Sequence, residues 1–305
     1  MKITNVTNAP KPFVWAVESG SWKPNPDRLY LTQLYQPPMI RKLTIDYWDE
    51  LEVDMLDQFF RIHGTAVHSI IEKAAKDRVG IQSEIRLAMP KDFFGIEITG
   101  RLDWIDYIES IIADIKNMSA ATYGRGLKDD WLAQLNISRY MLFRMHGYKA
   151  ENLRIYPLYR DWSSGKAMSS DHPDSPYGDI ELPVWSIKKT HEFIEKCVAD
   201  NMTEKVRFCS DEERWRTPDC YAVKKKGAAK AVAATTMIDG ERVPIPTKEL
   251  ATKIMNSKKN AKELSVEFRP GGCRRCEGYC DVRTICKEVN KAQWAKDEKE
   301  TKDES

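Results

Sequence analysis

Apolar side chains recur at helical spacing in the segment that follows Gly64. Four of them fall at positions i, i+3, i+4 and i+7, which is the pattern of a helix with one apolar stripe facing a core. His68 lies beside this stripe. The sequence therefore predicts a helix that begins near Gly64 and whose core-facing residues are Val67, Ile70, Ile71 and Ala74.

The next pattern is that of a β-hairpin. Two strand-like runs, 95–106 and 111–117, flank a short polar stretch at 107–110. Runs of this length with so short a connection predict two antiparallel strands joined by a loop of about four residues.

The remaining periodicity predicts an α/β protein. Helices are expected at about 128–146, 186–206 and 247–264, a strand at 152–162, and a basic hairpin or loop from residue 221. We expect a central mixed β-sheet that contains the hairpin and is flanked by helices, followed by a helical C-terminal segment that carries cysteines.

Four regions follow from these elements. An extended and helical N-terminal segment covers 1–60, and the core with the hairpin covers 61–186. A C-terminal region at 187–290 carries the basic and cysteine-rich stretches. Residues 291–305 form a charged tail.

The hairpin brings two aspartates and a lysine together. If the loop is 107–110, Asp106 pairs with Ile111, and counting outwards places Asp103 opposite Asp114. Directly opposed residues on one sheet face have Cβ atoms about 4.5–5.5 Å apart. Lys116, two residues after Asp114, projects from the same face.

Carboxylates this close repel each other unless a proton or a cation lies between them. A hard divalent cation is the expected ligand, since carboxylates, waters and phosphate oxygens suit its shell. Such a cation polarises a phosphoryl oxygen and acidifies a water, and Lys116 would orient that water or stabilise developing charge. The same spacing also fits two acids at a solvent-facing sheet edge with Lys116 as their counter-ion.

The order of motifs around the hairpin resembles that of one nuclease superfamily. GTAVHSIIE, Glu84, GRLDWID, ADIKN and WLAQLN follow each other as in the PD-(D/E)XK nucleases, and most closely as in their RecB-like, phage-type exonuclease branch. The resemblance runs from about Pro37 to Cys286. It implies a restriction-endonuclease-like core and Mg²⁺- or Mn²⁺-dependent hydrolysis of DNA phosphodiester bonds.

The resemblance also implies a role for single residues. Asp103 and Asp114 match the two metal-binding acids, and His68 matches the motif histidine that helps to ligate the metal. Lys116 matches the catalytic lysine. Gln134 matches the glutamine of the following helix, which supports the site and contacts DNA in the family.

The chain departs from the family pattern after the glutamine. The family has a tyrosine four residues later, and this chain has Ser138. Tyr140 lies on another face of the predicted helix, so the role of that tyrosine is not transferred. Glu84 is expected to be a solvated strand residue, with membership of the metal shell as the alternative.

Four of the seven cysteines fall within fourteen residues near the C-terminus: Cys273, Cys276, Cys280 and Cys286. The cytosol keeps thiols reduced, so a dense cluster in a cytosolic protein predicts a metal site and not disulfides.

The resemblance implies a 4Fe–4S cluster at this site. In the iron–sulfur members of the branch, three C-terminal cysteines and one distant cysteine hold the cluster, which here would be Cys276, Cys280, Cys286 and Cys209. The spacing between Cys276 and Cys280 departs from the family pattern, so a local set with Cys273 as the fourth ligand stays open. Four local thiolates also suit tetrahedral Zn²⁺, and thiolate ligands alone do not choose between the two metals.

Charge limits how the chain would bind nucleic acid. The formal net charge is only +2, so binding must depend on a local basic patch. Cations attract phosphates without reading sequence, although a lysine-rich loop is also simply well solvated. The expected DNA contacts are Lys224, Lys225, Lys226, Arg274 and Arg275.

The leading hypothesis is a divalent-metal-dependent DNA exonuclease of phage-type recombination or DNA processing. Its partner is DNA, and a recombinase, annealing protein or helicase is compatible with the resemblance. One alternative is a non-catalytic DNA-binding or scaffolding module with a structural cysteine-metal site, which the intact Asp103, Asp114 and Lys116 argue against. Another is a structure-specific endonuclease, or an RNA-cleaving enzyme, with the same centre. The oligomeric state stays open.

Localisation follows from what the sequence lacks. No window approaches the roughly 20 apolar residues of a membrane helix, and the first twenty residues contain no run of signal-peptide length. We therefore expect a cytoplasmic protein without a membrane partner, in the host cytoplasm if the gene is carried by a phage.

Overall fold

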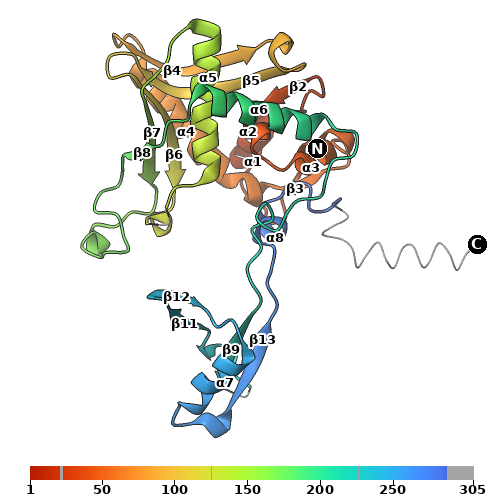
Figure 1. Ribbon diagram of the computed structural model, residues 1–305, viewed down its shortest axis with the longest axis vertical. Helices are drawn as coiled ribbons and strands as arrows, with labels where there is room; N and C mark the ends of the chain where they lie inside the picture. The colour runs from red at the N-terminus through yellow and green to blue at the C-terminus, as the bar shows by residue number, and fades with distance from the viewer. Residues whose placement is uncertain (21–22, 125, 226, 287–305) are drawn as a thin grey trace, which may run out of the picture. The chain divides into compact units, whose positions relative to one another are not determined.

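The computed structural model describes residues 1–20, 23–124, 126–225 and 227–286. The chain divides into two compact units (Figure 1). The larger unit contains Met1–Phe208 and the C-terminal residues from Thr284, and the smaller unit is Cys209–Arg283. Lys226 and the tail at 291–305 lie outside the described residues.

The larger unit is built on a mixed sheet of six strands, as expected for an α/β fold. The order is β2-β5-β6-β7-β8, and β4 pairs with β5. The pairs β2–β5 and β6–β7 are parallel, and the other pairs are antiparallel. The bounds are β2 Arg28–Tyr30, β4 Ile81–Met89, β5 Glu97–Asp106, β6 Ile111–Met118, β7 Asn152–Tyr159 and β8 Ile180–Leu182.

Six of the eight helices in the described residues belong to the larger unit. None of the described helices is long and apolar enough to cross a membrane. A short parallel pair, β1 (Lys2–Thr4) with β3 (Glu52–Asp54), precedes α4 in the chain. The helices are α1 Lys11–Ser19, α2 Leu31–Leu34, α3 Pro38–Asp46, α4 Met55–Ala75, α5 Asp129–His146 and α6 Ile187–Met202.

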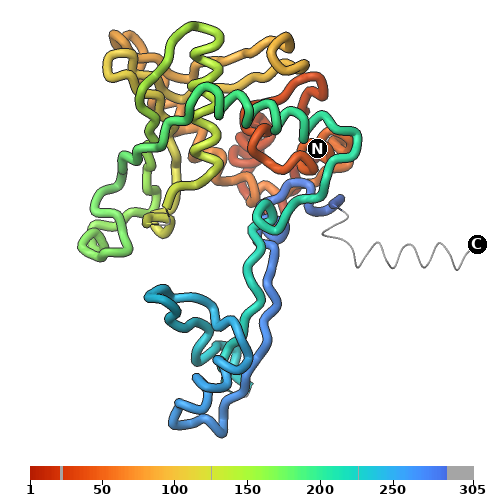
Figure 2. Tube along the Cα trace, viewed as in Figure 1, coloured from red at the N-terminus to blue at the C-terminus, as the bar shows by residue number. Residues whose placement is uncertain are grey.

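The helices α4 and α5 cover opposite faces of β6. Val67 of α4 lines a cavity together with Ile115, whereas Gln134 of α5 bonds to Asp114 and Lys116. Successive strand residues point to opposite faces, so each helix reaches a different side of the strand. Helix α6 packs against α5 over the sheet (Figures 1 and 2).

The core lies between the sheet and the α5–α6 pair. Strands β6 and β7 contribute near-continuous apolar runs, which is typical of strands that are covered on both faces. Helix α5 is largely buried, and Tyr140 is almost completely so. The core residues include Leu102, Ile105, Ile112, Leu153, Ile155, Leu135, Met141 and Ile194.

The smaller unit is mainly β-structure, so the prediction of a helical C-terminal segment was wrong. Strands β9 (Cys220–Lys225), β10 (Ala231–Ala233) and β13 (Leu264–Arg269) form an antiparallel sheet in the order β10-β9-β13. Figure 2 shows the chain of β9 and β13 running side by side. The β9–β10 pair confirms the basic hairpin expected from residue 221.

A helix predicted at 247–264 in this unit ends early. Helix α7 is Lys248–Asn256, and the chain enters β13 eight residues later. The run from Leu264 to Arg269 alternates in a way that suits a strand, and it pairs with β9 along its whole length. The strand overlaps the predicted helix only at Leu264, and the residues between α7 and β13 form turns, including one 3-10 turn at Ala261–Glu263.

A second hairpin joins β11 (Thr235–Ile238) to β12 (Glu241–Pro244). Its two loop residues are Asp239 and Gly240, and both have positive φ. An Asp-Gly pair suits a two-residue turn of this kind, because the turn requires left-handed backbone at both positions.

The helix predicted from Gly64 begins nine residues earlier. The Asp54 carboxylate accepts a hydrogen bond from the Leu56 amide at 3.0 Å and caps the helix there. The predicted stripe is only partly correct, because Val67 and Ile71 are half-buried while Ile70 and Ala74 are exposed.

Burial predicts unequal costs for two identical substitutions. Ile112 is fully buried near the start of β6, whereas Ile70 is 66% exposed. We expect Ile112→Ala to destabilise the larger unit by about 2–5 kcal/mol, since it leaves a cavity. Ile70→Ala should change stability by less than about 0.5 kcal/mol. Hydrogen exchange of the amides in β6 and β7 measures both, and equal effects would contradict this description of the core.

Candidate metal centre

Three carboxylates lie in one row across three adjacent strands. The β5–β6 register pairs Trp104 with Ala113, so the next position outwards sets Asp103 against Asp114. This confirms the register expected from the loop length. On the other side of β5 the registers on either side of Glu84 place Glu84 opposite Asp103. Paired strands are about 4.8 Å apart, so Glu84 and Asp103 are immediate neighbours. Asp114 acts on Asp103 from one position beyond the last β5–β6 pair and raises its pKa.

The strands are distorted where the acids meet. The backbone pairing of β5 with β6 ends at Trp104 and Ala113, and beyond it the Asp103 carboxylate accepts a hydrogen bond from the Ile115 amide at 3.0 Å. Glu84 has a φ of 53°, in the left-handed region that L-residues seldom adopt. Such local strain persists only where surrounding contacts hold it, and it is concentrated at functional sites.

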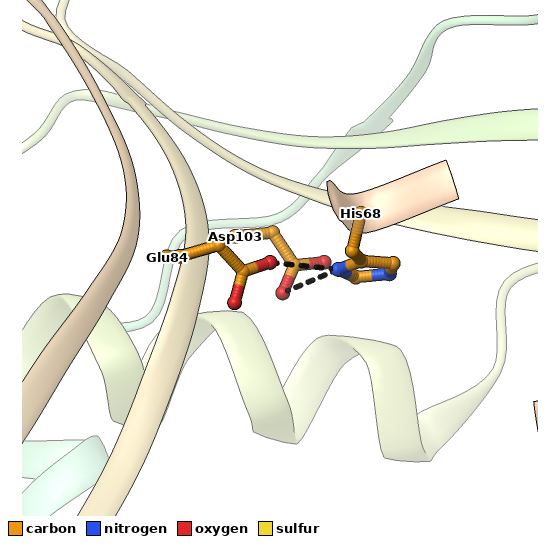
Figure 3. A group of neighbouring side chains, drawn as sticks. All are labelled: His68, Glu84 and Asp103. Carbon is orange, nitrogen blue, oxygen red and sulfur yellow. Dashed lines mark hydrogen bonds and ion pairs between the residues drawn. The ribbon is translucent and has the colours of Figure 1, made fainter. Parts of the chain in front are cut away.

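His68 of α4 points at two of the three acids (Figure 3). Its Nδ1 atom lies 3.0 Å from Oε1 of Glu84 and 3.5 Å from Oδ1 of Asp103. One ligand atom from each residue lies within 4.8 Å of the others. Two carboxylates and an imidazole at this separation have the donor types and spacing of a metal-binding group.

The third acid is held from the opposite side by an amide and an ammonium group. Gln134 Nε2 donates to Asp114 Oδ1 at 2.6 Å, and Lys116 Nζ lies 2.7 Å from Asp114 Oδ2. Lys116 Nζ also donates to Gln134 Oε1 at 3.0 Å. These three side chains form a closed triangle, which Tyr35 extends by donating its hydroxyl to Gln134 Oε1 at 3.3 Å.

Burial and like charge act together on Asp103. Burial, followed by the neighbouring Asp114 carboxylate, raises the pKa of the Asp103 carboxyl to about 7, against the opposing effect of His68. Burial also raises the pKa of the Tyr35 hydroxyl, so that hydroxyl stays protonated. The site therefore holds more negative charge than it can easily keep without a proton or a cation.

The predicted site residues fall into these two adjoining groups. His68 and Asp103 belong to the first group, Lys116 and Gln134 belong to the second, and Asp114 links them through its position beside Asp103. Glu84 was expected to be solvated, yet its side chain is only 7% exposed and pairs with Arg101 at 2.6 Å. Its signal in the sequence was its place in the strand before the hairpin, but only pairing with β5 brings it to Asp103.

The two positions where the family pattern is broken lie away from the acids. Ser138 is buried and donates its hydroxyl back to the Gln134 carbonyl along α5 at 2.9 Å. The Tyr140 hydroxyl lies 2.7 Å from Nδ1 of His191 on α6. Neither residue replaces the family's tyrosine beside the glutamine.

The cysteine-rich segment of the smaller unit is anchored by backbone pairing. Arg216 and Cys273 form an isolated β-bridge, and the Arg275 amide donates to the Arg214 carbonyl at 3.1 Å. Gly271 lies against the Thr217 carbonyl, where no Cβ would fit. These contacts hold the stretch after Cys209 against the stretch around Cys273 and Cys276.

Burial differs among the predicted ligands. Cys280 is buried, and so is Cys286, which belongs to the C-terminal stretch of the larger unit. Cys209, Cys273 and Cys276 are half-buried. Both predicted ligand sets, with Cys209 or with Cys273 as the fourth cysteine, stay predictions. By contrast, burial raises the pKa of Cys197 to about 11, which suits the ordinary thiol expected there.

The predicted DNA-binding cations differ in their surroundings. Lys224 pairs with Glu267 at 2.9 Å, and Lys225 pairs with Glu263 at 2.9 Å. These carboxylates offset part of the positive charge expected on β9. Arg275 lies 4.6 Å over the Trp215 ring, and Arg274 is exposed.

Comparisons with known proteins leave the family open. No family model matches the chain, and no curated protein matches it. Among solved structures, the chain is similar to SSO0001, with 18% sequence identity and a TM-score of 0.45. The match covers 67% of this chain and 89% of that chain. A similarity of this degree assigns neither a family nor a function.

The raised pKa of Asp103 predicts how stability depends on pH in metal-free protein. Asp103 holds its proton up to about pH 7 when folded and loses it near pH 4 when unfolded. Its contribution to stability is therefore present below about pH 4 and is lost as the pH rises to about 7. Asp103→Asn should remove this loss and stabilise the protein at pH 8 by about 2–4 kcal/mol.

Chemical denaturation in EDTA at pH 4.5 and pH 8 measures this difference. The matched control is Asp92→Asn, which changes an exposed aspartate before β5. Equal stability changes for the two variants at pH 8 would mean that Asp103 carries no buried charge.

Proposed function

We propose that this chain is a divalent-metal-dependent deoxyribonuclease of the PD-(D/E)XK type, with a restriction-endonuclease-like core. The observation that carries the proposal is the meeting of His68, Glu84 and Asp103 directly beside the triangle of Asp114, Lys116 and Gln134. The same motifs supported the resemblance in the sequence. Their convergence from five separate elements argues against acids that merely line a solvent-facing edge.

The donor set fits Mg²⁺ or Mn²⁺. Asp103 and Asp114 would hold the ion, with His68 and Glu84 as further donors around the same point. When bound, the ion supplies positive charge that polarises a phosphoryl oxygen and acidifies a water. Its positive charge would also offset the repulsion between the buried carboxylates, which together with burial raises the pKa of Asp103.

Lys116 and Gln134 have distinct tasks in this proposal. Lys116 Nζ stabilises negative charge that develops on the phosphoryl group and orients the attacking water. Gln134 bonds to both Asp114 and Lys116, so it fixes the distance between acid and ammonium before substrate arrives. Tyr35 holds Gln134 in turn through its hydroxyl.

Exonucleolytic action and a role in phage-type recombination or DNA processing rest on the resemblance alone. Attack from an end, a recombinase, annealing protein or helicase as partner, and a cytoplasmic location belong to that part of the proposal. A structure-specific endonuclease, an RNA-cleaving enzyme and a non-catalytic binding module are the outcomes that a cleavage assay separates from it.

Asp114→Ala should reduce DNA cleavage by at least about 10³-fold, since it removes a metal-binding acid and the partner of Lys116. Cleavage is measured with Mg²⁺ or Mn²⁺ on end-labelled linear DNA, covalently closed circles and RNA of the same sequence. The matched control is Glu109→Ala, which removes an exposed acid from the β5–β6 loop and should leave the rate unchanged.

Each result has one meaning. Loss of linear DNA alone supports an exonuclease, and cutting of the circles means an endonuclease at the same centre. Cleavage that survives in Asp114→Ala would mean that this site is not the catalytic centre. Binding of DNA without cleavage of any substrate would support the non-catalytic scaffolding module.

We also propose that the C-terminal cysteines hold a thiolate-bound metal, a 4Fe–4S cluster or, as the alternative, Zn²⁺. Backbone pairing of the stretch after Cys209 with the stretch around Cys273 and Cys276 supports a metal that staples chain segments together. The thiolate donors fit either metal.

Protein purified without oxygen should show visible absorption and bound iron if a cluster is present, or bound zinc without colour. Cys276→Ser should lose the metal in either case. Cys209→Ser and Cys273→Ser separate the two ligand sets, because only the true fourth ligand is needed. Cys197→Ser is the control, and metal retained by all three other variants would contradict the site.

A further inference from the structure

We propose that an aromatic pocket next to the metal centre binds one unpaired nucleobase of the substrate. The pocket has a volume of about 400 Å³ and lies where β6 and β7 end and α5 begins. Its walls include Met118, Tyr123, Trp131, Tyr159 and Tyr177. The inference rests on the proposed nuclease function and adds to it the form of DNA that the site would take.

The pocket continues the surface that carries the candidate catalytic residues. Met118 follows Lys116 by two residues on β6, so both side chains leave the same face of the strand. Trp131 precedes Gln134 by three residues on α5, which places them on neighbouring positions of one helical face. The pocket is therefore two residues along β6 and about one turn along α5 from the contact between Lys116 and Gln134.

The pocket also lies at the carboxyl ends of two parallel strands, which is a common place for ligand binding. Strands β6 and β7 are parallel and in register, with Lys116 beside Pro157 and Met118 beside Tyr159. Ligands of open α/β sheets bind beyond the carboxyl ends of parallel strands, where the loops diverge. Tyr159 ends β7, and its ring packs edge-to-face on Tyr123 with the centroids 6.2 Å apart.

Core packing does not account for the Tyr123 ring in the wall of the pocket. Tyr123 is 43% exposed, whereas Trp131 and Tyr159 are buried. An exposed ring beside two buried aromatic rings presents a face on which a flat, apolar ring can stack. Tyr177 also borders the pocket, but its pairing with Leu158 directs its side chain to the other face of the sheet. Unpaired bases bind proteins in this way, whatever their sequence.

Charge around the pocket decides which part of a nucleotide would enter. Asp174 lines it, so its carboxylate would repel a phosphate from the interior, whereas Asp179 pairs with Arg154 at 3.6 Å. Lys128 lies outside these walls at the start of α5, with Nζ 4.9 Å from the centre of the Trp131 ring. The base would therefore enter the pocket while a neighbouring phosphate stays outside near Lys128.

A pocket of this kind takes only a base that is free of its partner strand. A paired base is stacked inside the duplex and must be extruded before side chains can enclose it. The proposal therefore predicts a substrate that is single-stranded, or frayed by at least one nucleotide, next to the phosphate that is cut.

The test uses Asp114→Ala protein with Mg²⁺, so that the DNA stays intact, and single-stranded oligonucleotides with one 2-aminopurine. The label is moved one position at a time from the end. Its fluorescence should change strongly at one position, where the base is enclosed between rings. Adding Tyr123→Ala should abolish that change and weaken binding about tenfold, since a stacking contact is lost. Tyr47→Ala, which removes an exposed tyrosine from the end of α3, should do neither.

An abasic sugar at the responding position gives the second measurement. It should weaken binding to protein that keeps Tyr123 about tenfold and have little further effect once Tyr123 is alanine, because both changes remove the same contact. Blunt duplex DNA should bind more weakly than either single strand.

Independent, additive losses, or no position with a fluorescence change, would overturn the pocket. In that case metal-dependent cleavage by the native protein would still support the nuclease. Absence of both DNA binding and cleavage would remove the proposed function itself, so the two failures are distinguishable.

Discussion

The crowding of three carboxylates on three adjacent strands is the constraint on which the candidate site depends. Glu84, Asp103 and Asp114 are nearly removed from solvent, and each has a cationic or proton-donating neighbour. Burial destabilises the charged form of these carboxylates and strengthens their repulsion, and both effects raise the pKa of Asp103. A fold that gained only stability from this region would not place three acids there, so their retention fits a site that accepts positive charge from outside.

The rest of the larger unit positions the neighbours of these acids. Helix α4 brings His68 to Asp103, and α5, on the other face of β6, brings Gln134 to Asp114. Ile112 and Ile155 belong to the close-packed core between the strands and α5, and this packing fixes the distance of the helix from the sheet. Two helices on opposite faces can meet one row of acids only because β5 and β6 separate beyond Trp104 and Ala113, where the Asp103 carboxylate bonds the freed Ile115 amide.

Local pattern predicted those parts of the fold that depend on neighbouring residues. The β5–β6 register follows from loop length alone, and with it the meeting of Asp103, Asp114 and Lys116. The sequence did not assign Glu84 to the metal site, because the position of Glu84 depends on the register in which β4 pairs with β5. The hairpin between β5 and β6 does not fix that register. Long-range pairing also defines the sheet of the smaller unit, where β13 pairs with β9, a strand that lies far from it in the sequence.

The arrangement separates the rigid part of the site from the part that would adapt to substrate. The acids and Lys116 stand on central strands whose backbones are held by partners on both sides, which suits groups that must keep fixed distances. The exposed ring of Tyr123 stands instead on the connection that follows β6, where a side chain can move to enclose a base. The two parts meet along β6, which contributes Lys116 to the site and Met118 to the pocket, so a base held in the pocket would place its neighbouring phosphate towards Lys116.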